Sequence, residues 1–167
     1  MNLLNLEMMN ATERMAEALK MRGLFVTQEN GIITFTNENA KHDLIDVKEL
    51  LDQLNIPIIW HTDTIMEVLV NRLPVVYMKK ITNAGGRNFS IHMNGYHYQW
   101  RAFAQRRFGL KIDVFQLEPN MSLLTRILNK VGISTLSGCN GHHKSAPEFK
   151  LSGIYNGAWL KIVQKNT

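Results

Sequence analysis

Cysteine is almost absent from this sequence of 167 residues, since Cys139 is the only one. A single cysteine excludes a disulfide within the chain and is typical of a reducing compartment, so we expect a cytoplasmic protein. No apolar run approaches the roughly 20 residues that a membrane-spanning helix needs. The first residues also lack the basic segment and the long apolar run of a signal peptide. We therefore expect no membrane partner.

Carboxylates are missing from one long stretch, because no Asp or Glu lies between Glu67 and Asp113. Residues 1–67 hold 11 Asp and Glu against 5 Lys and Arg, a net charge of −6. Residues 68–167 hold 3 against 14, a net charge of +11. The acid-free stretch contains eight basic residues: Arg72, Lys79, Lys80, Arg87, Arg101, Arg106, Arg107 and Lys111. A basic segment of this kind favours a partner rich in phosphate or in other negative charge.

The composition is that of a folded chain, with 45% hydrophobic and 20% charged residues. The length fits one domain, 1–167, in which residues 1–67 are the acidic segment and residues 68–167 the basic one. We predict an α+β fold: an N-terminal amphipathic helix and a mixed central sheet of short strands, with helices packed on that sheet.

Apolar spacing and turn residues predict the individual elements. Helices are expected over 4–22, ending at Gly23, and over 42–54, 62–73, 119–131 and 156–164. Strands are expected over 24–28 and 32–36, joined by an Asn30-Gly31 turn, and over 56–60, 75–82, 89–93, 110–117, 133–137 and 149–152. Two interpretations stay open after Asn94-Gly95: a hairpin strand over 96–103, or a helix over 94–108 with Asn94 as its N-cap. The Ala-Gln-Arg-Arg-Phe-Gly ending favours the helix.

The first candidate site is the stretch 96–111, where aromatic and basic residues alternate. Guanidinium and ammonium groups bind phosphates, and aromatic rings stack on bases. We expect phosphate contacts from Arg101, Arg106, Arg107 and Lys111, and stacking by Tyr98 and Trp100. The alternative is an amphipathic element whose aromatic residues lie in the core.

The second candidate site is the Gly-rich loop 137–147. Cys139 could serve as a nucleophile activated by His142 or His143, or could ligate a metal with them. Lys144 and the backbone amides of the loop could instead hold an anion. The alternative is an ordinary surface loop.

The third candidate is the triplet Glu148-Phe149-Lys150 together with Asp113. Carboxylates that hold a divalent metal, beside a lysine that steadies water, occur in metal-dependent nucleases. Such a triplet is also common by chance on an exposed strand. The leading hypothesis is therefore a nucleic-acid or phosphate-ligand binding module, with a metal-dependent nuclease or hydrolase as one alternative. A homodimer joined by its acidic and basic halves is another.

Overall fold

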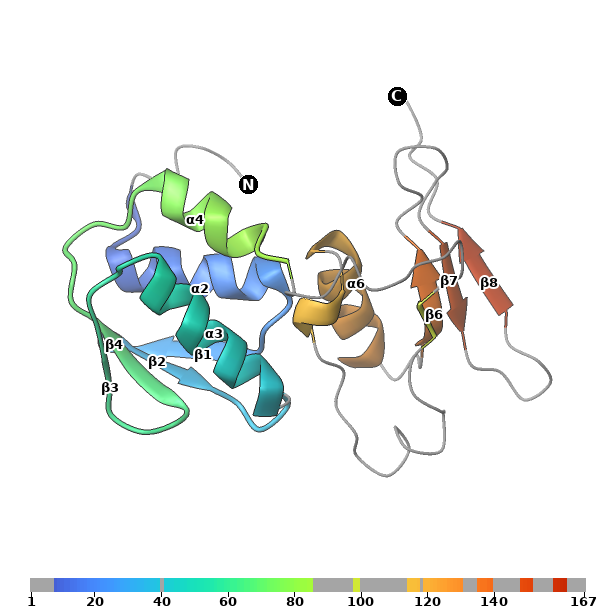
Figure 1. Cartoon of the computed structure of the whole chain (residues 1–167), viewed down its shortest axis with the longest axis horizontal. Helices are drawn as coiled ribbons and strands as arrows, with labels where there is room; N and C mark the ends of the chain where they lie inside the picture. Colours follow the sequence, from blue (N-terminus) through green and yellow to red (C-terminus); the bar gives the residue numbers. More distant parts are fainter. Residues whose placement is uncertain are drawn as a thin grey trace.

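The structure is a computed structural model, and it confirms the α+β class (Figure 1). Among the described residues, helices accompany two separate four-stranded sheets, whose strands pair antiparallel. No helix among the described residues is long and apolar enough to cross a membrane. The described residues are 8–39, 41–85, 98–99, 114–117, 119–130, 135–139, 148–151 and 158–161.

The predicted N-terminal helix is α2 (Ala11–Arg22), which begins later than expected. Asn10 and Glu13 form a capping box that fixes this start, since each side chain accepts a hydrogen bond from the other residue's backbone N–H. Gly23 ends the helix with φ at 105°, a left-handed conformation that glycine adopts without strain. The first residues of the prediction, 4–7, lie outside the described residues.

The hairpin predicted from Asn30-Gly31 is confirmed. β1 (Val26–Glu29) pairs antiparallel with β2 (Ile32–Phe35). Asn30 and Gly31 have φ of 49° and 82°, and two positive φ values in a two-residue loop match the twist of a hairpin.

The helix predicted over 42–54 is α3 (Lys41–Gln53). It ends where Asn55 takes a positive φ of 51° ahead of Pro57. β3 (Ile58–Trp60) follows, as expected, and pairs antiparallel with β4 (Ile65–Val68). The helix predicted over 62–73 is wrong. Its apolar residues also fit a two-residue period, and pairing of β4 with both β2 and β3 selects the strand.

The N-terminal sheet has the strand order β1-β2-β4-β3, and each of its two hairpins follows a helix. The order helix, strand, strand thus occurs twice, and the second strands of the two units, β2 and β4, pair antiparallel at the centre of the sheet. Two helix–strand–strand units related by a local twofold axis would pair their second strands in this way. One face of the sheet is buried under the helices (Figure 1).

The strand predicted over 75–82 is wrong, because these residues form α4 (Val75–Thr82). Met78 and Ile81 are its buried residues, and their three-residue spacing is helical rather than extended. α4 packs along α2 in the same direction. The start of α2 reaches Leu73 through Arg14, and its end reaches Ala84 through Arg22.

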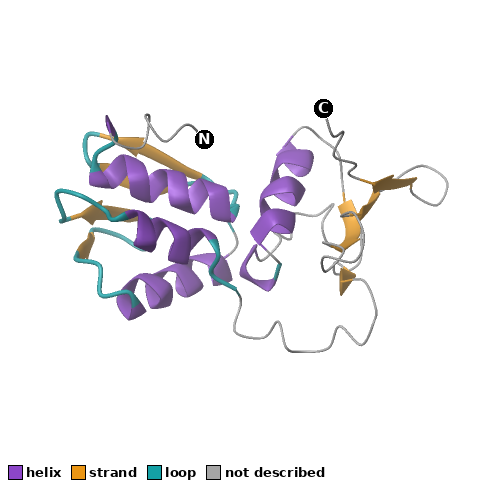
Figure 2. Cartoon of the chain, turned by 90° about the horizontal axis from the view of Figure 1, so that it is seen from above, coloured by secondary structure: helices purple, strands orange, loops and turns teal. Residues whose placement is uncertain are grey.

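The core also takes in residues from much later in the chain. η1 (Val114–Gln116) is a 3-10 turn, so the strand predicted over 110–117 is wrong at these positions. Its place is fixed by the backbone N–H of Val114, which donates to Oδ1 of buried Asp43 over 2.7 Å. α6 (Pro119–Lys130) confirms the helix predicted over 119–131. In Figure 2, α6 lies between the N-terminal helices and the C-terminal strands.

The C-terminal sheet has the order β5-β6-β7-β8, formed by Tyr98–Gln99, Thr135–Cys139, Glu148–Leu151 and Ala158–Lys161. β6 and β7 correspond to the strands predicted over 133–137 and 149–152. The helix predicted over 156–164 is wrong at β8, and the helix favoured over 94–108 is wrong at Tyr98 and Gln99. The single mixed sheet is replaced by two antiparallel ones. Pairs that follow one another in the chain, such as β1–β2 and β6–β7, are antiparallel as hairpins are, whereas β2–β4 and β5–β6 pair antiparallel across longer connections. The strand predicted over 89–93 lies outside the described residues.

Candidate functional site

The exposed face of α4 carries basic residues beside apolar ones. Lys79 and Lys80 lie exposed in its last turn, and Arg72 is exposed just before the helix. Val75 and Val76 on the same helix are 42% and 55% exposed. None of the three cations forms an ion pair within the described part of the chain. We call Arg72, Lys79 and Lys80 the α4 basic surface, and it is open to an external anion.

Three of the described arginines, by contrast, belong to the interior, and Arg14 is the first of them. Its side chain is 2% exposed and lies at the start of α2. Nε donates to the carbonyl oxygen of Met9 over 3.1 Å, and Nη1 donates to that of Leu73 over 3.0 Å. Carbonyl oxygens satisfy the donors that burial would otherwise leave unpaired, so this arginine is a structural residue.

Arg22, the second interior arginine, lies at the other end of α2 and is fully buried. It donates to the carbonyl oxygens of Ala84 and Leu117 and to Oγ of Ser122. Its guanidinium carbon lies 4.8 Å from the ring centre of Phe115. One side chain thus joins α2, the end of α4, the residues after η1, and α6.

Arg126 on α6 is 5% exposed, and it lies 4.2 Å from the ring centre of Phe25. Its Nη2 donates to Oδ1 of Asn39 over 3.1 Å, while its Nε has no hydrogen-bond partner among the described residues. Burial lowers the pKa of Arg126, and the charges of Asp43 and Glu38 oppose that shift. The guanidinium therefore acts inside the fold, where no phosphate can reach most of its surface.

These burials alter the charge split that the sequence predicts. Residues 1–67 lose Arg14 and Arg22, two of their five cations, from the surface, and lose only Asp43 among their described carboxylates. The N-terminal surface is therefore more acidic than the residue count suggests. The α4 basic surface belongs to the same packed unit, since α4 packs along α2.

The open face of the N-terminal sheet is unsuited to phosphate. Its alternate positions hold two carboxylates and no lysine, arginine or aromatic residue; they are Thr27, Glu29, Ile32, Thr34, Ile59, Ile65 and Glu67. Glu67 lies 3.0 Å from Nε2 of His61. The aromatic residues of this sheet, Phe35 and Trp60, stack on the buried side with ring centres 5.9 Å apart. Bases and phosphates find neither stacking surface nor cations there.

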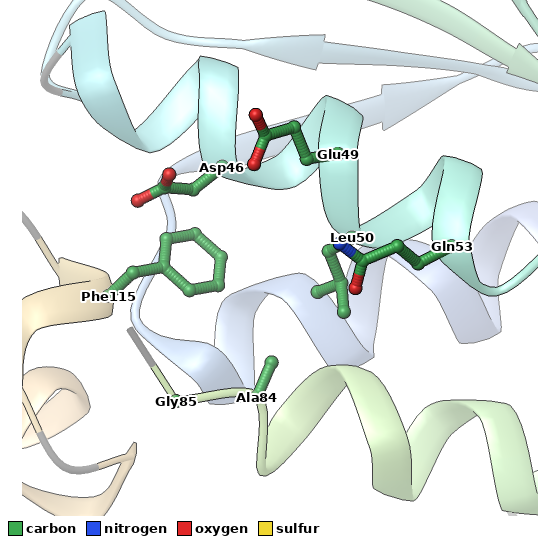
Figure 3. A pocket seen from close by; sticks show the side chains of 7 residues that line it. All are labelled: Asp46, Glu49, Leu50, Gln53, Ala84, Gly85 and Phe115. Carbon is green, nitrogen blue, oxygen red and sulfur yellow. The ribbon is translucent and has the colours of Figure 1, made fainter. Parts of the chain in front are cut away.

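A small pocket lies between α3, the end of α4 and η1 (Figure 3). Its volume is about 70 Å³, Ala84 and Gly85 lie on the side opposite α3, and Phe115 lies at one end beside Asp46. Asp46, Glu49 and Gln53 line the α3 side at helical spacing. Two carboxylates on one wall repel phosphate, so this pocket is unsuited to an anion.

The predicted phosphate-binding residues fall largely outside the described part of the chain. Tyr98 is placed in β5, where it pairs with Gly138 of β6. The remaining predicted residues lie outside the described ranges, and their roles stay predictions: Trp100, Arg101, Arg106, Arg107, Lys111 and Lys144.

The structure brings together only some of the predicted catalytic and metal-binding residues. Cys139 pairs directly with Glu148 across β6 and β7, and Lys150 pairs with Ser137. Asp113, His142 and His143 lie outside the described residues. Within the described ranges no three His, Cys, Asp or Glu residues gather as a metal site would require. The nuclease and thiol hypotheses therefore stay predictions.

Two residues that sequence reasoning did not assign to a site lie beside the predicted ones. Trp159 and Lys161 on β8 pair with Lys150 and Glu148 on β7. The prediction of a helix over 156–164 separated them from this sheet. Ala158 and Leu160 alternate with Trp159 and Lys161, and this two-residue alternation is the signal that favours a strand.

The chain matches no protein-family model, and it shows no significant similarity to a curated protein or to a solved structure.

Proposed function

We propose that this protein is a nucleic-acid-binding module without catalytic activity of its own, and that the α4 basic surface contacts phosphates. The exposure of Lys79 and Lys80, unpaired with any described carboxylate, carries the proposal. Because these ammonium groups form no ion pair with a described carboxylate, contact with a phosphate does not require such a pair to break. The single cysteine of the chain suits a reducing compartment, so we propose the cytoplasm as its location.

The buried arginines sharpen this proposal by elimination. Arg14, Arg22 and Arg126 have their guanidinium groups committed to the core. Cations available to a polyanion must come from elsewhere, and among the described residues before α6 the densest exposed group is the α4 basic surface. Exposed Val75 and Val76 add apolar area beside it, which suits contact with sugars and bases.

The test is a fluorescence-anisotropy titration of labelled single-stranded and duplex oligonucleotides, with the full chain at several salt concentrations. Binding should weaken steeply with salt, because phosphate contacts release counterions. The variant Lys79→Glu/Lys80→Glu should lower duplex affinity at least tenfold. It should also reduce the slope of log affinity against log salt by about 2, since each phosphate contact contributes about 0.9 on duplex DNA.

A matched control exists on the acidic side. Lys20→Glu/Lys41→Glu makes the same change in net charge at two other exposed lysines. Lys20 also lies in the last turn of a helix, like Lys79 and Lys80, so its helix-dipole cost is comparable. Equal loss in both double variants would mean that α4 is not the contact surface. Absence of binding by the wild type at low salt would overturn the proposed function, and salt-dependent self-association in sedimentation would then favour a homodimer.

A further inference from the structure

The C-terminal sheet separates its residues into two chemically different faces. Directly paired residues of antiparallel strands lie on the same face, and successive residues alternate between faces. One row across β6, β7 and β8 is Cys139, Glu148 and Lys161. Two residues away along these strands, a second row crosses all four strands of the sheet and consists of Gln99, Ser137, Lys150 and Trp159. These two rows share one face, which we call the polar face.

The opposite face takes the intervening row and its neighbours. It holds Tyr98, Gly138, Phe149 and Leu160, and further along β6, β7 and β8 it holds Thr135, Leu151 and Ala158. These positions hold no charged residue, and Thr135 is their one polar side chain, as is typical of a sheet side that packs on other residues. The polar face holds two lysines, Lys150 and Lys161, and a single carboxylate, Glu148, so its register positions carry more cations than anions.

We propose that the polar face of the β5–β8 sheet binds single-stranded nucleic acid, with Trp159 stacking on a base and Lys150 and Lys161 contacting phosphates. Lys150 is the direct register partner of Trp159, and Lys161 follows Trp159 by two residues on the same strand. That spacing is about 7 Å along β8. A tryptophan position that neighbours two lysine positions on one face combines the residue types that single-strand binding uses, an aromatic side chain and cations. This inference rests on the proposed function and extends it to a second surface.

Unpaired strands are the favoured class because stacking needs an exposed base. In a duplex the base faces are covered by their neighbours, so an aromatic residue on a flat sheet gains nothing from them. The N-terminal sheet supplies the internal contrast, since its open face carries Glu29 and Glu67 and no aromatic residue. Of the two described sheets, only the C-terminal one has a face that combines tryptophan with lysines.

The first measurement uses the fluorescence of Trp159 to report binding of single-stranded DNA. The full-length variant Trp60→Phe/Trp100→Phe leaves Trp159 as the single tryptophan. Titration with oligothymidylate should quench its fluorescence along the same curve that anisotropy gives, whereas duplex DNA should leave its fluorescence unchanged. Binding of the oligonucleotide with no change in Trp159 emission would overturn the inference.

The second measurement uses unmodified protein, so it tests the inference even if the tryptophan variant does not fold. Ultraviolet crosslinking to oligothymidylate, followed by peptide mapping, should give adducts in the β7–β8 segment. Adducts confined to other segments would overturn the inference.

Charge reversal separates the two surfaces. Lys150→Glu/Lys161→Glu should lower single-strand affinity at least tenfold and should change duplex affinity no more than Lys20→Glu/Lys41→Glu does. Equal loss of both affinities would overturn the single-strand assignment but leave the proposed function standing. Wild-type protein that binds neither form would instead remove the proposed function, so the two failures are distinct.

Discussion

Arg22 and Ser122 are joined by hydrogen bonds in both directions, although 100 residues separate them. Nη1 of Arg22 donates to Oγ of Ser122 over 2.6 Å. The same Oγ lies 2.6 Å from the carbonyl oxygen of Arg22 and 2.9 Å from that of Pro119, so its proton has an acceptor on either side. The pair closes the contact between α2 and α6, and it ties the later residues of the chain to the N-terminal core.

We expect this pair to be energetically coupled. Ser122→Ala should lower the free energy of unfolding by about 1–3 kcal/mol, since it leaves a buried donor of Arg22 unpaired. Arg22→Met should cost at least as much, because several buried oxygens lose their donor. The double variant should cost less than the sum of the two, with a coupling of about 1–3 kcal/mol in urea unfolding. Simple additivity would show that the pair is not linked in solution.

Gly23 is expected to tolerate no side chain. A Cβ added there would lie 2.9 Å from Oγ and 3.1 Å from the carbonyl carbon of Ser122, at a φ of +105°. Gly31 is the matched control, because its φ is +82° and nothing lies within 4 Å of an added Cβ. Gly31→Ala should therefore cost about 1 kcal/mol for backbone strain alone. Gly23→Ala should cost clearly more in the same unfolding experiment, and equal costs would contradict the close approach of α2 and α6.

Asn39 links the first hairpin to α6. Its amide nitrogen donates to the carbonyl oxygens of Phe25 and Thr36, and its Oδ1 accepts from the backbone of Phe25 and from Arg126. Asn39→Ala should lower the free energy of unfolding by about 2–4 kcal/mol, because these buried groups lose their partners. Asn37→Ala is the control at an exposed position two residues away, and should change it by less than about 0.5 kcal/mol.

Asp63 should titrate below its ordinary range. Nζ of Lys48 donates to its Oδ1 over 2.8 Å, and this hydrogen bond with the lysine charge lowers the pKa of Asp63. A lowered pKa means that the contribution to stability is present above the ordinary pKa and is lost as pH falls through the lowered one. Carboxyl NMR titration should show the shift, and Lys48→Met should abolish it while Lys41→Met leaves it in place. High salt should also reduce it, since both groups meet solvent.

Local signals predicted the elements whose form is decided locally. Asn30-Gly31 specifies its hairpin, and Gly23 ends its helix, because both depend on backbone angles that few residues adopt. The segments 62–73 and 75–82 were predicted wrongly because their apolar residues fit both periods. What decides between them is distant, namely the pairing of β4 with β2 and the packing of α4 on α2.

The candidate site shows the same division. Lys79 and Lys80 belong to the acid-free stretch that the charge count already singled out, although the sequence predicted a strand where α4 carries them. Trp159 and Lys161 could not be predicted, since only the strand register puts them beside Lys150 and Glu148. Burial of Arg14 was equally hidden, whereas Arg22 continues the three- and four-residue spacing of Ala11, Met15 and Ala18, which marks the buried side of that helix.

The repeated helix–strand–strand order has a consequence for the growing chain. β2 is complete at Phe35, yet its central partner β4 ends at Val68. At about 5–20 residues per second, synthesis of residues 36–68 takes about 2–7 s. Throughout that interval the nascent first hairpin has an unpaired inner edge with Ile33 and Phe35 uncovered, the kind of edge that other chains can join. Protection of this protein from aggregation is therefore needed most before the second unit leaves the ribosome.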